Sequence, residues 1–139
     1  FKKVKKLIPD AVNLHQFMTR TKNPITVISV NKTKNAREYF DALAKLKDNL
    51  RIVVFVDDDK NDVLNSYMLV WRVTNNMDAQ RDVFVSELMV GVDGTNKNEL
   101  DGFEREWPDD VDCTLSVVES LKERGIWDLD EKIYKDLQL

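Results

Sequence analysis

Three short apolar runs along the chain have the pattern of buried strands. Residues 25–30 follow Pro24 and are rich in β-branched side chains, in a run too short for a helix. Residues 52–56 are apolar without interruption, which is typical of a strand covered on both faces in a parallel sheet. Residues 82–85 show a shorter version of the same pattern. The chain therefore contains strands that are expected to lie inside a sheet.

Two amphipathic helices are predicted between these runs. The first begins at Asn35 as N-cap, with Glu38 as its capping-box partner, and its apolar side chains recur at helical spacing: Ala36, Tyr39, Phe40, Leu43 and Ala44. The second extends over about residues 62–75, ends at Asn75-Asn76, and carries the stripe Leu64, Tyr67, Met68 and Trp71. Because Tyr67 and Trp71 lie on this stripe, both are expected in the core.

The order strand, helix, strand, helix, strand predicts an α/β fold, with a Rossmann-like, largely parallel sheet flanked by helices. Residues 91–112 hold three of the four glycines and are predicted to form a long irregular loop. Two helices are expected to follow, over about 114–124 with Gly125 at C′ and over about 129–137 with Asp128 as cap. Residues 2–8 suit a helical turn and 12–14 a short edge strand. We expect one α/β domain over 1–139, of which 126–139 is a terminal helical extension.

Composition and charge exclude several function classes. The 139 residues are 42% hydrophobic and 33% charged, as in an ordinary globular domain. The net charge of −4 offers no general field for binding nucleic acid, and no apolar stretch is long enough for a membrane span. The single Cys113 allows no disulfide framework and fits a cytoplasmic location. Because the chain begins at Phe1 rather than Met, we expect a piece of a longer protein.

An acidic triplet, Asp57, Asp58 and Asp59, ends the central apolar run, at the place where open α/β sheets bind ligands. These carboxylates could cap the following helix, assist a metal or repel an anion, or make an interdomain contact. The haloacid-dehalogenase phosphatase pattern fails, because residues 60–61 do not continue it. A receiver-like signalling module is the alternative, with the Asp57–Asp59 cluster and Lys97 around Mg²⁺. Its pattern is incomplete, because the next strand ends at Ser86-Glu87 rather than at an Asp.

Other reactive side chains are sparse. The glycines match neither the dinucleotide-binding nor the P-loop spacing, and a zinc site would need more than His15 and Cys113. We expect His15 on a surface turn and Cys113 buried or half-buried. Trp107 either fills a gap under its loop or faces a missing neighbour. The last helix carries an apolar stripe that packs either on its own sheet or on a second subunit, namely Leu129, Ile133 and Leu137, with Trp127 before it.

Four segments carry a more specific signal. Residues 51–59 run from an apolar strand into Asp-Asp-Asp, 69–71 read Leu-Val-Trp, 78–83 read Asp-Ala-Gln-Arg-Asp-Val, and 91–97 read Gly-Val-Asp-Gly-Thr-Asn-Lys. With Trp107-Pro108 they resemble, in order, the C-terminal domain of the UbiD-like decarboxylases, over about residues 25–108. The chain departs from that pattern at three residues, with Ala79 in place of Pro, Asn76 in place of Arg and Gly94 in place of Ala. Its connection between residues 85 and 91 is also shorter than in the family. These departures indicate a distinct branch, which we associate with menaquinone-making bacteria.

The resemblance implies a parent carboxy-lyase of the 3-octaprenyl-4-hydroxybenzoate or menaquinone-biosynthesis type. Such an enzyme decarboxylates an aromatic or α,β-unsaturated acid, here a naphthoate or benzoate precursor of a quinone, with prenylated FMN, a divalent metal and K⁺. The family's catalytic Glu and Arg residues and its cofactor-binding segment lie upstream of this stretch. The resemblance therefore assigns no catalytic residue, metal ligand or cofactor to this fragment, which we expect to be inactive alone.

The resemblance also implies two roles and two partners for the fragment. It is expected to close over the substrate pocket beside the upstream domains of the same chain, and to join subunits into a homo-oligomer through its terminal helix. The implied pocket wall is Glu87, Met89, Asp93, Thr95 and Lys97. The implied oligomer contact is Trp127, Leu129, Ile133 and Leu137.

Overall fold

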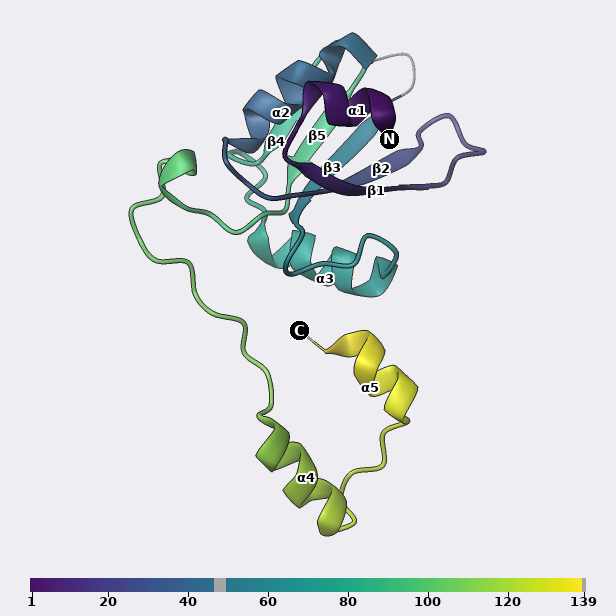
Figure 1. Ribbon diagram of the computed structural model, residues 1–139, viewed down its shortest axis with the longest axis vertical. Helices are drawn as coiled ribbons and strands as arrows, with labels where there is room; N and C mark the ends of the chain where they lie inside the picture. Colours follow the sequence, from purple (N-terminus) through teal and green to yellow (C-terminus); the bar gives the residue numbers. More distant parts are fainter. Residues whose placement is uncertain (47–49, 139) are drawn as a thin grey trace. The chain divides into compact units, whose positions relative to one another are not determined.

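The computed structural model describes residues 1–46 and 50–138 (Figure 1). The elements in chain order are α1 (Lys2–Leu7), β1 (Ala11–Phe17), β2 (Ile25–Val30), α2 (Ala36–Leu43), η1 (Ala44–Leu46), β3 (Ile52–Asp57), α3 (Ser66–Asn76), β4 (Val83–Val85), β5 (Val90–Asp93), η2 (Glu99–Asp101), α4 (Leu115–Glu123) and α5 (Glu131–Leu137). The chain divides into two compact units, one ending at Trp107 and one from Pro108 onward. The terminal extension expected from residue 126 therefore belongs to a larger unit that begins at Pro108.

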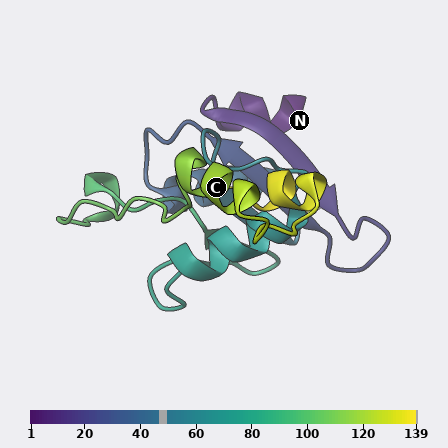
Figure 2. The same ribbon diagram turned by 90° about the horizontal axis from the view of Figure 1, so that it is seen from below.

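The first unit is a three-layer α/β fold, as the sequence predicted. Its sheet has the order β1-β2-β3-β5-β4. Helices α1 and α2 lie on one face and α3 on the other, as Figures 1 and 2 show from two directions. The centre is parallel, because β3 pairs in parallel with both β2 and β5, whereas β1 and β4 are antiparallel edges. The predicted strand order was wrong at this edge, because β5 overlaps the stretch 91–112 that was expected to be irregular and pairs with β4 as an antiparallel hairpin.

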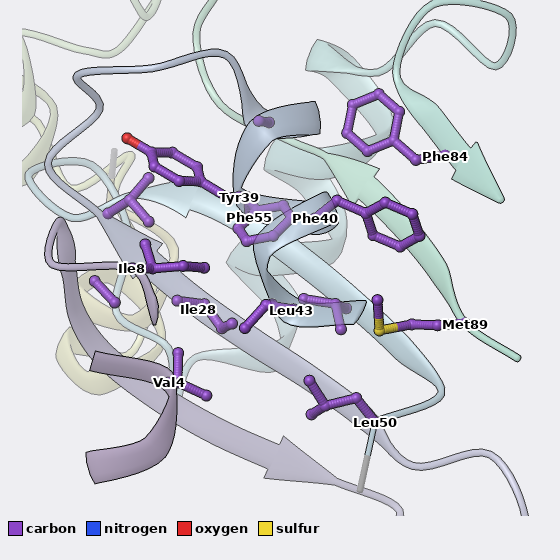
Figure 3. Close-up of a cluster of buried hydrophobic side chains, with 14 residues drawn as sticks. Val4, Ile8, Ile28, Tyr39, Phe40, Leu43, Leu50, Phe55, Phe84 and Met89 are labelled. Atoms are coloured by element: carbon purple, nitrogen blue, oxygen red, sulfur yellow. The ribbon is translucent and has the colours of Figure 1, made fainter. Parts of the chain in front are cut away.

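The larger part of the core lies between the sheet and the layer of α1 and α2 (Figure 3). Alternate side chains of a strand point to the same face of the sheet. Ile28 and Val30 of β2 and Val53 and Phe55 of β3 therefore point into this part of the core. Helix α2 supplies the opposite surface with the predicted stripe, and its N-cap is Asn35, whose side chain accepts from the Arg37 N–H at 2.9 Å. The ring of Phe40 lies 5.7 Å from that of Phe84, centroid to centroid. This contact packs α2 against the edge strand β4.

Helix α3 corrects the sequence prediction most clearly. It buries Leu69, Arg72 and Asn76, while Tyr67 is 66% and Trp71 37% exposed. The expected apolar stripe is therefore on the outer side of the helix. The reason lies in the contacts of the other side, because Leu69 packs in the second hydrophobic cluster with Val27 and Val56, and the Asn76 side chain donates to the Gly94 carbonyl oxygen at 3.0 Å.

Three further expectations are also wrong. His15 lies within strand β1, paired with Val27, and its ring packs edge-on against Phe17 at 4.6 Å. Cys113 is exposed. Helix α5 begins with Asp130 rather than Asp128 as its N-cap, and the Asp130 carboxylate accepts from two backbone N–H groups. By contrast, Gly125 has a φ of 66° after α4, the left-handed conformation expected at C′.

Candidate functional site

A buried ion pair stands at the carboxyl end of β5. The Lys97 ammonium lies 3.0 Å from Asp93 Oδ2 and 3.7 Å from Asp82 Oδ1, and the Lys97 side chain is fully buried. It also donates to the backbone oxygens of Asp93 at 3.0 Å and Thr95 at 2.8 Å. Thr95 closes the turn, since its hydroxyl and its N–H both donate to Asp93 Oδ1. These bonds fold residues 93–97 into one compact turn.

A second buried lysine joins this turn to the end of β2. Lys32 donates to Thr95 Oγ1 at 2.8 Å, to the Asn96 carbonyl oxygen at 3.0 Å and to Asp101 Oδ2 at 2.5 Å. Its ammonium is also 4.0 Å from Asp93 Oδ2. The side chains of Lys32 and Asp101 are 5% and 4% exposed. Lys32 thus connects β2, the turn after β5 and η2.

Asp82 completes the network just before β4. Its carboxylate accepts two hydrogen bonds from the Arg81 guanidinium, at 2.8 and 2.7 Å, and one from the Asp78 N–H. Burial alone would raise the pKa of Asp82, but the Arg81 hydrogen bonds, the Asp78 N–H and the charge of Lys97 together hold that pKa below its ordinary value. The network therefore pairs three cations with three carboxylates, namely Lys32, Arg81 and Lys97 with Asp82, Asp93 and Asp101.

The acidic triplet after β3 divides into three different environments. The Asp57 carboxylate accepts from the Asn96 N–H at 2.7 Å, and its burial raises its pKa. Asp58 accepts from the Ser29 hydroxyl at 2.6 Å and from the Asn13 amide at 3.3 Å. Asp59 is exposed. The helix-capping interpretation was wrong, because eight residues, 58–65, separate the end of β3 from the start of α3, and the N-cap of α3 is Asn65.

An open cleft of about 990 Å³ lies above this network, at the carboxyl ends of β2 and β3. Asp57, Lys32 and Lys97 contribute to its lining, and the loop after η2 contributes two aromatic rings. Those rings, Phe103 and Trp107, pack on each other with centroids 5.2 Å apart. Trp107 therefore contacts its own loop and is half-buried there.

The predicted pocket-wall residues do not share one surface. Asp93, Thr95 and Lys97 are brought together in the network, Met89 is 2% exposed in the hydrophobic core, and Glu87 is exposed in the connection between β4 and β5. Their role in a substrate pocket stays a prediction. Sequence reasoning missed Lys32, Asp82 and Asp101. Only Lys32 had an available signal, because it lies just beyond β2 and the carboxyl ends of parallel strands meet at one edge. Asp82 precedes the antiparallel strand β4 and Asp101 lies in η2, so only the fold brings them to that edge.

The geometry does not support the receiver-like alternative. Lys97 is enclosed by two aspartates and is not turned toward the Asp57–Asp59 cluster as a free cation. Within residues 1–46 and 50–138, no group of three or more His, Cys, Asp or Glu side chains is arranged to hold a metal ion. In the same part of the chain, no helix combines the length and apolar character needed to cross a membrane.

Comparison with known sequences gives one family over most of the first unit. The family model for the 3-octaprenyl-4-hydroxybenzoate carboxy-lyase C-terminal domain matches residues 1–102. An uncharacterised Helicobacter pylori protein is 44% identical over 116 residues, which cover 83% of this chain and 19% of that protein. An Archaeoglobus fulgidus protein is 35% identical over 94 residues, 55% of this chain and 19% of that protein. The chain thus spans about a fifth of the length of these relatives.

Solved structures share the fold. The evolved dimeric form of the UbiD-class enzyme HmfF from Pelotomaculum thermopropionicum, in complex with prFMN, matches with a TM-score of 0.61 and 24% identity, over 84% of this chain and 28% of that one. Sedimentibacter hydroxybenzoicus vanillic acid decarboxylase matches in its open form with a TM-score of 0.61 and 21% identity, over 90% and 31%. Its closed form matches with a TM-score of 0.58 and 20% identity, over 90% and 31%.

Proposed function

Because the chain belongs to the 3-octaprenyl-4-hydroxybenzoate carboxy-lyase C-terminal domain family, we propose that it is the noncatalytic domain of a cytoplasmic decarboxylase that shapes the substrate entrance and joins subunits. The parent's substrate is an aromatic acid of quinone biosynthesis, and a prenylated benzoate is the form that the family's description names. The parent's reaction releases CO₂ from that acid.

The closed ion network is the observation that carries the noncatalytic role. Lys32 and Lys97 are both nearly or fully buried, and each uses its ammonium on carboxylates and backbone or hydroxyl oxygens. A general acid, a general base or a phosphate clamp needs a group that is free to meet its ligand. Because these cations are committed to Asp93, Asp82 and Asp101, the network supplies rigidity to the cleft.

The residues of this chain do not fit the flavin phosphate of the prenylated FMN that we expect in the parent. A phosphate cradle needs glycine backbone open to a ligand. Here a Cβ at Gly91 would meet the Phe40 ring at 2.4 Å, and one at Gly94 would meet Val73 Cγ2 at 2.7 Å. Both glycines serve close packing inside the first unit. The flavin, with its divalent metal and K⁺, is therefore a ligand of the parent's other domains in this proposal.

Two observations support a role of this domain in closing the substrate entrance: the position of the cleft in the sheet, and the two forms in which a structurally similar enzyme is described. The cleft lies where ligands bind in α/β sheets, and the network below it holds its floor in one shape. The vanillic acid decarboxylase is described in an open and a closed form, so an enzyme that shares this fold adopts two conformations. We propose that the network residues Asp93, Thr95 and Lys97 support the wall of this cleft from beneath. Glu87 lies outside that wall, because the β4–β5 turn precedes Val90, which pairs with Ile52 at the amino end of β3.

The subunit contact is assigned to helix α5. Leu129, Ile133 and Leu137 are 47%, 49% and 40% exposed. Trp127 is half-buried and packs edge-on against Tyr134, with ring centroids 5.0 Å apart. Ile133 and Leu137 lie one turn apart on α5 and Leu129 lies just before it, and such a group of exposed apolar side chains favours a protein contact over solvent.

The proposal is tested by flavin binding and turnover. The 139-residue chain is mixed with FMN and prenylated FMN, dialysed, and examined by absorbance, and CO₂ release is measured with a 3-prenyl-substituted 4-hydroxybenzoate. We expect no retained flavin and no CO₂ from the chain, and both from the parent enzyme that contains it. Retained flavin or turnover by the chain alone would contradict the noncatalytic role.

A further inference from the structure

An apolar groove lies on the other side of the sheet from the main core, between α3 and the β1–β2 hairpin. Its volume is about 300 Å³, at the lower end of the range for small-molecule sites. It is lined by Phe17, Met18, Ile25, Val27, Val54, Ser66, Leu69, Val70, Val73 and Thr74. It is distinct from the cleft, because it opens at the first residue of β2 and the cleft at the last.

The lining of the groove selects for an uncharged ligand. No charged residue lines it, although a third of the chain's residues are charged. Of its two hydroxyl groups, that of Thr74 already donates to the Val70 carbonyl oxygen at 2.8 Å. A charged or strongly polar ligand would lose its hydration here without gaining hydrogen bonds. An apolar chain would lose no hydrogen bonds to water and would cover apolar side chains that are now in water.

Buried side chains form the floor of the groove, and exposed side chains form its rim. Val27 and Leu69 are 4% and 5% exposed at the floor, packed with Val56 and Val63. At the rim, Met18 is 61% and Val70 64% exposed. Met18 has a φ of 54°, a left-handed conformation that a non-glycine residue adopts at a cost. A flexible methionine at the rim can follow the shape of an apolar ligand.

We propose that this groove binds a prenyl chain, and that it holds part of the hydrocarbon tail of the parent's substrate. The inference rests on the proposed function, since the family's description names an octaprenyl-substituted benzoate. The tail is a flexible, uncharged, branched hydrocarbon, which matches the aliphatic lining. The aromatic acid head group is not a ligand of this groove, because the lining offers no cation to its carboxylate.

The test uses geraniol, a short prenyl alcohol, and the 139-residue chain with labelled Ile, Val and Met methyl groups. NMR spectra are recorded during titration below the aggregation limit of geraniol. We expect saturable shifts of the Met18, Val54, Val70 and Val73 methyls and none at Val85, which lies on β4. 4-Hydroxybenzoate is expected to shift none of the groove methyls. Absence of saturation, or shifts spread over the whole chain, would overturn the proposal.

Variants separate this site from other apolar contacts. Val70→Asp places a charge on the rim, at a position exposed enough for the chain to fold, and is expected to weaken geraniol binding at least about tenfold. Val111→Asp, at a side chain 92% exposed in the second unit, is the matched control and is expected to bind as the unchanged chain does. Equal affinity of the two variants would contradict the proposal.

A second copy of the chain is the competing occupant of the groove. If sedimentation velocity shows self-association that Val70→Asp abolishes and Val111→Asp does not, a protein contact covers the groove and the prenyl proposal is wrong. The titration needs neither flavin nor turnover. Its failure therefore leaves the test of the proposed function intact, and catalysis by the chain alone would leave the groove result intact.

Discussion

Lys97 Nζ lies 3.0 Å from Asp93 Oδ2, four residues apart, with 0% of one side chain and 3% of the other exposed. Taking such charges out of water costs several kcal/mol for each ion, which only close pairing and further hydrogen bonds offset. Lys97 obtains both from Asp93, Asp82 and two backbone oxygens. The turn after β5 is therefore held in a single conformation.

Breaking this pair is expected to destabilise the fold strongly. Lys97→Met leaves the Asp93 carboxylate buried and without its closest cation, so the free energy of unfolding should fall by about 3–5 kcal/mol. Urea denaturation followed by circular dichroism measures the loss. Lys122→Met is the control, because its pair with Glu131 is 38% and 63% exposed and should contribute less than about 1 kcal/mol. Equal effects of the two substitutions would show that burial of the network has no energetic consequence.

The stability of the chain is expected to fall in acid, partly through Asp82. Because the folded state lowers the pKa of Asp82, its ionised form stabilises the fold above the unfolded pKa of about 3.9. This contribution is lost as the pH falls through the lower, folded pKa. Asp10 acts in the same direction, since hydrogen bonds from Thr33 and Tyr39 lower its pKa.

Two variants isolate the contributions of single carboxyl groups. Asp57 has the opposite effect to Asp82 on the pH dependence of stability, because burial raises the pKa of Asp57 and makes its ionised form unfavourable in the folded state. Between pH 7 and pH 3, Asp82→Asn should therefore show a smaller loss of unfolding free energy than the unchanged chain, and Asp57→Asn a larger one. Urea titrations at several pH values measure both slopes. Identical slopes in all three proteins would contradict this assignment.

Gly94 stands where the related family has Ala, and the structure gives a reason for the difference. A Cβ at this position would lie 2.7 Å from Val73 Cγ2 and 3.2 Å from the Phe55 carbonyl oxygen. Gly94→Ala is expected to destabilise the chain by about 1–3 kcal/mol through overpacking. Val73→Ala should relieve part of this cost, so that the double variant is more stable than the sum of the single effects predicts. A strictly additive double-mutant cycle would exclude Val73 as the obstacle.

Deleting residues 126–139 tests the subunit contact assigned to α5. We expect the full chain to associate and the shortened chain to sediment as a single copy, because the deletion removes Ile133 and Leu137 with the rest of the apolar stripe. Sedimentation velocity at several concentrations measures the mass of each. An unchanged mass after deletion would remove α5 from the interface.

The sequence alone determined the strands and helices whose patterns are local. The β-branched run of β2, the apolar run of β3 and the Asn35 cap of α2 each depend on neighbours within a few residues, and all three are present in the structure. Four short segments in order, over residues 51–97, together with Trp107-Pro108 indicated the family, and the match of the family model over residues 1–102 confirms it.

Only the tertiary structure decided the partners of those residues. Strand β5 pairs with β3, and Lys32 forms an ion pair with Asp101, so each of these contacts joins segments that are far apart in the chain. Which side of α3 faces outward depends on such contacts as well. A stripe such as Tyr67 and Trp71 shows that one side of a helix is apolar, but not which side the sheet covers. The pairing of buried charges depends on the same long-range arrangement, because each ammonium is stable only where the fold brings carboxylates to it.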